Sequence, residues 1–355
     1  MQYRTFQKTG IQVSELALGA EHIESAPYDT VKDILDIAMD AGVNYADLFM
    51  GSPDIRDHFG KALQGRRDRM MIAGHLGATW RDGQYHRTRD LQMVKAFYFD
   101  LLKRLHTDYI DMLMIHYVDE MDDLKACLED GILQFALEQK QKGTARMLGI
   151  ATHVPAVAHA AIDTGHFDGI MFSVNPIFDL LPAEYGIEQL WNARESLRGQ
   201  ADMDTERRAL YTRCERECVG IIVMKTYMGG WLLSPDCPLQ MSASQCIHYA
   251  LSQPGVVTAA LGCRTPEEYA QSLAYMEAGE DERDFSLVYS SAFQWKDGPK
   301  CLYCNHCLPC PQHIDIASAM RRIDAGGEPP AGCTACGVCE TRCPFGVPVT
   351  EIFRP

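Results

Sequence analysis

The chain has no long hydrophobic run and comparatively few basic residues. Within its 355 residues no stretch of about 18 consecutive apolar side chains occurs, so we expect no membrane span and no membrane partner. Lys and Arg number 33 against 48 Asp and Glu, which gives a formal net charge of −15. A nucleic-acid surface needs clustered basic side chains, so this balance argues against a nucleic-acid partner.

The first residues also lack the apolar core of a secretory signal. They read Met-Gln-Tyr-Arg-Thr-Phe-Gln-Lys. We therefore expect a cytoplasmic protein in a reducing compartment, where cysteines form disulfides rarely.

Eight cysteines are concentrated near the end of the chain. One run reads C-L-Y-C-N-H-C-L-P-C-P from Cys301, and a second reads C-T-A-C-G-V-C-E-T-R-C-P from Cys333. Three cysteines at a spacing of two, followed by a fourth and a proline, are typical of a 4Fe-4S loop whose last thiolate binds a second cluster. The two runs therefore predict two 4Fe-4S clusters with crossed ligands: Cys301, Cys304, Cys307 and Cys343 for one, and Cys333, Cys336, Cys339 and Cys310 for the other.

Zinc is the main alternative, because paired Cys-x2-Cys motifs also describe a zinc ribbon. A zinc site needs four ligands, however, and the third cysteine of each run and the Cys-Pro ending would then have no role. The six other cysteines are scattered, and we expect reduced thiols: Cys127, Cys214, Cys218, Cys237, Cys246 and Cys263.

Residues 1–280 alternate short apolar runs with helical patterns. The hydrophobic content of 46% is enough for a globular core. Apolar side chains at successive positions are typical of parallel strands buried on both faces. Eight such runs predict a (β/α)8 barrel of the α/β class: 16–20, 43–49, 70–76, 109–116, 145–152, 169–175, 220–225 and 256–263.

The pattern changes after residue 280. Polar stretches at 281–284 and 296–299 flank an expected linker helix, and the cysteine runs follow. We therefore predict a second domain, 281–355, made of this linker and a small ferredoxin-like iron–sulfur domain. It has few apolar residues, so its clusters would hold it together.

Polar side chains stand at the ends of the predicted strands. Functional groups of such barrels lie at the C-terminal ends of the strands, where the loops form a binding site. Two histidines and an aspartate meeting there could transfer protons near neutral pH. The strand ends carry Asp47, His75, His116, Thr152, His153, Asn175 and Lys225.

Four stretches resemble the aldo-keto reductases. They are T-G-I-Q-V-S-E-L-A-L-G at 9–19, G-V-N-Y-A-D at 42–47, Y-I-D-M-L-M-I-H at 109–116 and L-G-I-A-T-H at 148–153. The likeness is stronger to the subgroup with a C-terminal ferredoxin-like module. It implies a catalytic aspartate, tyrosine, lysine and histidine, in which the tyrosine protonates a carbonyl while a nicotinamide delivers hydride.

The sequence departs from this catalytic set at two positions. Asp47 and His116 match it, but no tyrosine occurs in the L-F-M-G-S-P stretch after Asp47, and His75 stands at the lysine position. We expect His75, as an imidazolium held by Asp47, to be the replacement acid. Tyr85, His86 and Tyr117 could contribute from loops.

The resemblance also implies a nucleotide site, for NAD or NADP. Gly262 and Arg264 precede T-P-E-E, a capped helix start of the kind that binds phosphates. Glu268 stands where NADP-specific relatives often carry arginine, which is unfavourable for a 2′-phosphate. The other expected cofactor-binding residues are Thr152, His153, Asn175 and Lys225.

The leading hypothesis is an iron–sulfur oxidoreductase that reduces or oxidises a small carbonyl substrate at the barrel mouth. Its clusters would exchange electrons with an electron-carrier protein. One alternative is a lyase or dehydratase on the same barrel with structural clusters. Another is a nucleotide-binding or regulatory protein that has lost catalysis.

Overall fold

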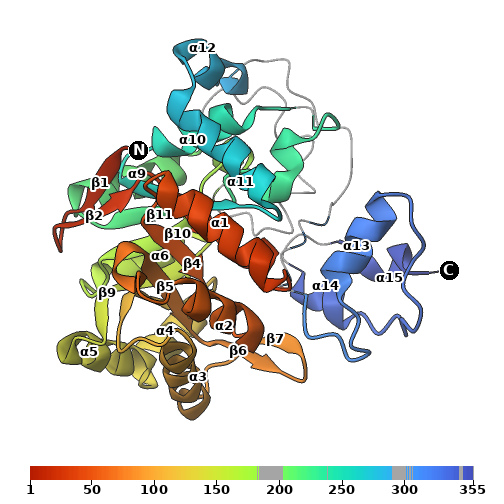
Figure 1. Ribbon diagram of the computed structural model, residues 1–355, viewed down its shortest axis with the longest axis horizontal. Coiled ribbons are helices and arrows are strands. Elements are labelled where there is room, and N and C mark those ends of the chain that lie inside the picture. The colour runs from red at the N-terminus through yellow and green to blue at the C-terminus, as the bar shows by residue number, and fades with distance from the viewer. Residues whose placement is uncertain are drawn as a thin grey trace.

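Eight parallel strands close a barrel (Figure 1). The computed structural model describes residues 1–181, 183, 203–237, 239–289, 301, 303, 305, 307–343 and 347–354. Every barrel strand falls within an apolar run predicted from the sequence, so the predicted barrel is confirmed. In chain order the strands are β3 (Leu16–Gly19), β4 (Tyr45–Leu48), β5 (Met71–Leu76), β8 (Ile110–Ile115), β9 (Ala145–Thr152), β10 (Gly169–Ser173), β11 (Gly220–Met224) and β12 (Val256–Gly262).

Helices cover the outside of the barrel. The helix start predicted at Thr265 is present, because the Thr265 hydroxyl accepts from the Glu268 amide. A second helix begins at a reciprocal capping box that Ser242 and Gln245 form. The Glu268 carboxylate accepts from the Arg264 amide instead of that of Thr265. The helices are α1 (Tyr28–Asp40), α2 (Pro53–Ala62), α3 (Leu91–Arg104), α4 (Met121–Glu129), α5 (Ile132–Lys142), α6 (Pro155–Asp163), α7 (Pro176–Asp179), α9 (Thr205–Arg216), α10 (Ala243–Leu251) and α11 (Pro266–Leu273).

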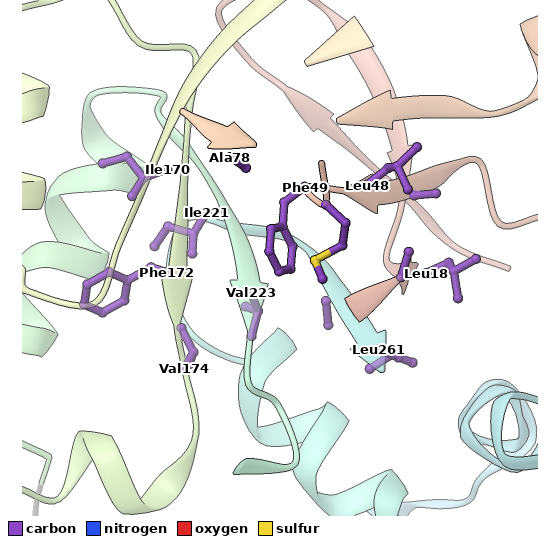
Figure 2. Packing of buried hydrophobic residues seen from close by; sticks show 14 of the residues in the cluster. Leu18, Leu48, Phe49, Ala78, Ile170, Phe172, Val174, Ile221, Val223 and Leu261 are labelled. Carbon is purple, nitrogen blue, oxygen red and sulfur yellow. The ribbon is translucent and has the colours of Figure 1, made fainter. Parts of the chain in front are cut away.

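Side chains of the strands alternate between two apolar clusters. Outward-facing residues, among them Leu18, Ile170 and Val223, pack in the large cluster that includes the helices (Figure 2). Inward-facing residues fill the barrel with an unusual share of methionine, whose flexible thioether adapts to irregular space. The inner cluster comprises Phe6, Val13, Ala17, Tyr45, Met71, Ala73, Met112, Met114, Met147, Ala151, Met171, Ile222 and Val257.

Two antiparallel hairpins, which the strand prediction did not include, flank the barrel. β1 (Tyr3–Phe6) and β2 (Ile11–Ser14) bring Phe6 and Val13 into the inner cluster. The second hairpin, β6 (Ala78–Arg81) and β7 (Gln84–Arg87), follows strand β5 directly. Its turn residues Asp82 and Gly83 have φ of 51° and 76°, the left-handed pair that a two-residue type I′ turn requires.

The C-terminal residues lie to one side of the barrel and carry three short helices (Figure 1). These are α13 (Ile316–Asp324), α14 (Val338–Arg342) and α15 (Val349–Ile352). α12 (Glu280–Arg283) coincides with the first of the polar stretches that flank the expected linker helix. Between the two stretches the 3-10 turn η5 (Ser286–Tyr289) is present, and residues 290–300 lie outside the described part. The remaining 3-10 turns are η1 (Glu21–Ile23), η2 (Arg67–Arg69), η3 (Met228–Leu233) and η4 (Ala274–Glu277). In the part of the chain described here, no helix is both long enough and apolar enough to cross a membrane.

Candidate active site

A cavity of about 420 Å³ opens at the C-terminal ends of the barrel strands. This is the face on which barrels of this architecture carry their functional groups. All three predicted catalytic residues line it, as do four of the six predicted cofactor-binding residues. These lining residues are Asp47, His75, His116, His153, Lys225, Gly262 and Arg264.

The polar residues reach the cavity because strand side chains repeat every two positions. His75 is two residues beyond Ala73, and His116 is two beyond Met114; both preceding residues belong to the inner cluster. In both cases the polar group occupies the next inward-facing position after the apolar cluster. Apolar packing below the histidines fixes their height in the barrel.

A chain of hydrogen bonds links the two histidines to an acid and a tyrosine. His75 Nε2 lies 2.8 Å from Asp47 Oδ1, and His75 Nδ1 lies 3.0 Å from His116 Nδ1. His116 Nε2 lies 2.6 Å from the hydroxyl of Tyr85 in β7. All four side chains are buried.

The chemistry of these partners restricts the direction of the bonds. Ionised Asp47 can only accept, so His75 Nε2–H donates to it. With both rings neutral, His75 Nδ1 accepts from His116 Nδ1–H, and His116 Nε2 accepts from the Tyr85 hydroxyl. One added proton makes His75 an imidazolium and reverses the bonds to His116 and Tyr85. Both arrangements of the protons keep the three hydrogen bonds of the chain.

Phe49 covers the histidine pair. Its ring stacks on His116 with centroids 5.1 Å apart and an interplanar angle of 12°, and it lies 5.9 Å from the His75 ring. Phe49 is itself buried and lines the cavity. An apolar ring at this place limits water contact and strengthens the electrostatic interactions of the pair.

A second histidine–carboxylate pair stands at the end of β9, the strand that pairs with β8. His153 Nδ1 lies 2.9 Å from Asp119 Oδ2, and the Thr152 hydroxyl donates to Asp119 Oδ1 at 3.1 Å. Burial alone would raise the pKa of Asp119, but His153 and the hydrogen bonds lower it below its ordinary value. Asp119 is thus held ionised and orients the His153 ring.

Thr152 and Asn175 are not among the residues lining the cavity, although the sequence suggested that they bind cofactor. Thr152 is fully buried against Asp119. Asn175 caps α7 by accepting from the Phe178 amide, and its amide donates to the Lys225 carbonyl. Their role toward a cofactor stays a prediction, whereas their hydrogen bonds position His153 and Lys225.

Cations gather at the opposite end of the cavity. Burial, and then the charges of Arg321, Arg264 and Lys225, lower the pKa of His22 to about 3. His22 is therefore neutral at physiological pH and surrounded by positive charge. Negative groups of a ligand are favoured at this end.

Four cysteines line a separate cleft in the C-terminal part. They are Cys310, Cys333, Cys336 and Cys339, with apolar walls that include Ile316 and Phe353. Cys343 is close enough to Cys301 for its charge to raise the pKa of that thiol, although burial has the larger effect. Cys304 lies outside the described residues. Across the described ranges, no three His, Cys, Asp or Glu side chains converge as ligands of a metal ion.

The hairpin β6–β7 joins this part of the chain to the barrel. Gln84 Oε1 accepts from the Cys310 amide at 2.6 Å, and Gln84 Nε2 lies 3.2 Å from the Cys310 carbonyl oxygen and 2.9 Å from His313 Nδ1. Gln84 is buried. Its neighbour Tyr85 contacts His116, so one short strand reaches both the cysteine cleft and the active-site cavity.

Residues 15–234 match the Aldo/keto reductase family, which is more than half of the chain. The chain belongs to the aldo/keto reductase family. It is an aldo/keto reductase-like oxidoreductase, as the sequence resemblance implied. Residues 301–355, with all eight clustered cysteines, lie beyond the matched region.

Relatives of this aldo/keto reductase are distant. The uncharacterized oxidoreductase YqkF of Bacillus subtilis (strain 168) is 28% identical over 193 residues, which are 52% of this chain and 60% of YqkF. Aldo-keto reductase YhdN of the same organism is 23% identical over 341 residues, covering 84% of this chain and 97% of YhdN. The holo form of aldo-keto reductase AKR11C1 from Bacillus halodurans has the same fold, with a TM-score of 0.62 at 21% identity over 83% of this chain and 98% of that one.

Several residues of this reductase's site were not predicted from the sequence, or were given only a minor role there. The hairpin carrying Gln84 and Tyr85 had a readable signal, Asp82-Gly83 between two short polar–aromatic stretches. Asp119 and Arg321 had none, because the first lies in a loop and the second on a helix outside the barrel. Only their contacts with His153 and His22 reveal them.

Proposed function

We propose that this protein is an iron–sulfur oxidoreductase that transfers hydride between a nicotinamide dinucleotide and a small carbonyl compound or its alcohol. The observation that carries the proposal is the buried Asp47–His75–His116 chain on the wall of the mouth cavity. It supplies a proton donor where the family's tyrosine and lysine are absent. The cavity volume suits a small molecule beside a cofactor's reactive end.

The residues around the cavity fit a nicotinamide dinucleotide. Lys225 and Arg264 offer positive charge for the phosphates, and His153 can hydrogen-bond the carboxamide. When bound, the cofactor would supply or accept the hydride at the substrate carbon. Gly262 leaves space beside His22: a Cβ atom there would lie 2.9 Å from His22 Cδ2.

The histidine pair would handle the proton that accompanies hydride transfer. Asp47 accepts from His75 Nε2–H at 2.8 Å, which orients the other ring nitrogen of His75 toward His116. A carbonyl oxygen that replaces the Tyr85 hydroxyl as the acceptor of His116 Nε2–H would take that proton as hydride reaches its carbon. The His75 Nδ1 proton would then pass to His116 Nδ1, which leaves both rings neutral and the hydrogen bond from His75 to Asp47 in place.

The C-terminal cysteines fit iron–sulfur ligation. The cleft's cysteines, Cys310, Cys333, Cys336 and Cys339, are the four that the crossed pattern assigns to one cluster. A cubane binds each thiolate to a separate iron, so its cysteines stand further apart than ligands of one ion. Such clusters carry single electrons, and we propose an electron-carrier protein as their partner and 281–355 as the domain that holds them.

A turnover assay on anaerobically purified protein tests this function. NADH or NADPH oxidation is followed with a panel of small aldehydes and ketones, for the wild type and for His75→Gln and His116→Gln. We expect turnover that falls about 10²- to 10⁴-fold in the variants, the usual contribution of a general acid. Turnover of a hydroxy compound without any reductant would favour the lyase alternative. If both variants are as active as the wild type, His75 and His116 are not the proton donor of the reaction.

A further inference from the structure

A second large cavity lies between the barrel and the C-terminal part. Its volume is about 520 Å³, and it shares Glu21, His22 and Arg264 with the mouth cavity. Its far wall comes from the C-terminal part and includes Asn305 and Arg321. The Aldo/keto reductase match ends at residue 234 and does not extend to this wall.

Two arginine side chains line this cavity. Arg264 follows β12, and Arg321 lies on α13; both lie over the ring of Tyr303, at 5.7 Å and 4.9 Å from its centroid. Burial, and then the charge of Arg264, lower the pKa of Arg321. The two positive charges disfavour each other, as the lowered pKa of Arg321 indicates, and an anion bound in the cavity would offset that cost.

Unpartnered polar atoms gather on the same cavity. Within the described residues, the buried side-chain atoms without a hydrogen-bond partner include four on its lining. Buried polar atoms normally have partners, so this concentration indicates a polar ligand. The atoms are Glu21 Oε1, Glu24 Oε1, Asn305 Oδ1 and Arg321 Nε.

The acids of the cavity do not neutralise the two arginines fully. Burial raises the pKa of Glu21, and it raises the pKa of Glu24 to about 8, so protonated Glu24 can donate a hydrogen bond. Asp315 accepts from the Ser318 amide and hydroxyl as the cap of α13. Glu267 is exposed at the rim.

Helix α11 begins at the same place. Its first residue, Pro266, and its cap, Thr265, line the cavity next to Arg264. The amino end of a helix carries partial positive charge. Glu268 accepts from the Arg264 amide at 2.7 Å, so its carboxylate is already engaged in the helix start.

We propose that Arg321 of the C-terminal part, together with Arg264, binds a phosphate on the adenosine half of the nicotinamide dinucleotide. The inference rests on the proposed function, because it takes the dinucleotide as the ligand of the mouth cavity. Arg321 Nη2 lies 3.3 Å from His22 Nδ1, and His22 lines both cavities. A dinucleotide reaching from the histidine pair past His22 would meet both arginines. The cysteine-bearing part would then complete the nucleotide site as well as carry clusters.

The test is a binding titration of the full-length protein with its clusters in place. NADPH, NADH and reduced nicotinamide mononucleotide, which lacks the adenosine half, are titrated by fluorescence against the wild type, Arg321→Ala, Arg321→Lys and Arg322→Ala. Arg322 is the exposed neighbour on the same helix and serves as the matched control. The visible absorbance of each variant shows whether its clusters are intact.

We expect Arg321→Ala to raise the Kd for the dinucleotide about 10- to 100-fold, the effect of one charged hydrogen bond. Arg321→Lys should be intermediate, because it keeps the charge without the planar fork. Arg322→Ala and all mononucleotide titrations should stay within about twofold, the scatter expected for an uninvolved surface site. A loss confined to NADPH supports contact with the 2′-phosphate, and a loss with both dinucleotides supports contact with the pyrophosphate.

Two results would overturn the inference. One is dinucleotide binding by Arg321→Ala equal to that of the wild type. The other is an equal loss of mononucleotide binding, which would show that Arg321 only maintains the fold. If the wild type binds no nicotinamide nucleotide at all, the proposed function fails first and the inference falls with it.

Discussion

Gln84 and Tyr85 are adjacent in strand β7, yet their side chains bind opposite parts of the molecule. Gln84 holds the backbone of Cys310, and Tyr85 hydrogen-bonds to His116. The pleat of a strand sends successive side chains to opposite faces. One peptide bond, between Gln84 and Tyr85, therefore separates the contact to Cys310, a predicted cluster ligand, from the contact to the active-site histidines.

The Gln84 contact should hold the C-terminal part against the hairpin. Gln84→Ala removes the acceptor of the Cys310 amide and the donor to its carbonyl. We expect amide hydrogen exchange in residues 308–313 to become about tenfold faster, the effect of roughly one net hydrogen bond. The control is Gln134→Ala, whose exposed amide donates to Glu138 on the same helix. Unchanged exchange at Cys310 would contradict this role.

The Tyr85 hydroxyl should fix the orientation and tautomer of His116. Tyr85→Phe deletes it while keeping the ring, so we expect kcat to fall about tenfold with little change in KM. Steady-state kinetics with the best substrate of the carbonyl panel measures this. Tyr98→Phe is a matched control, because the Tyr98 hydroxyl donates to the Thr144 carbonyl far from the cavity. If both variants lose the same activity, Tyr85 has no special role.

Iron content should identify the metal chemistry of the cysteine runs. We expect about eight iron atoms and eight acid-labile sulfides per chain, as two 4Fe-4S clusters require. Cys336→Ala should leave about half of each, because it removes a ligand of only one cluster. Cys218→Ala, at an exposed cysteine outside the runs, should change nothing. Zinc without sulfide in the wild type would establish the ribbon alternative instead.

Glu24 should make stability depend on pH in an unusual direction. Burial, and then the charges of Glu21 and Asp315, raise its pKa from 4.5 to about 8. The folded state therefore binds this proton more tightly than the unfolded state, and the contribution to stability is complete below about pH 4.5 and lost as pH rises through 8.

Glu24→Gln stays neutral throughout and should avoid that loss. Between pH 5 and pH 9 we expect the unfolding free energy of the variant to rise relative to that of the wild type, on the order of a few kcal/mol. Urea unfolding at several pH values measures the difference. Glu129→Gln, at an exposed glutamate of α4, should show no such trend. If the unfolding free energies of Glu24→Gln and the wild type change with pH in the same way, Glu24 does not have a raised pKa in the folded protein.

The barrel could be predicted because its signals are local. Each strand is a short apolar run, and the helix starts at Ser242 and Thr265 carry their own capping residues. Asp47, His75 and His116 could also be placed, since strand ends of a closed barrel meet at one mouth. Their mutual hydrogen bonds could not, because ring orientation depends on packing by Phe49 and on the hydroxyl of Tyr85.

The sequence by itself determined the eight strands, the cysteine spacing and the strand ends that carry polar groups. These follow from periodicity and ligand spacing within a few residues. Only the tertiary structure decided that Tyr85 completes the histidine chain, that Gln84 holds Cys310, and that Arg321 shares a cavity with Arg264. Those contacts join residues up to hundreds of positions apart, and no local pattern encodes which distant side chains meet.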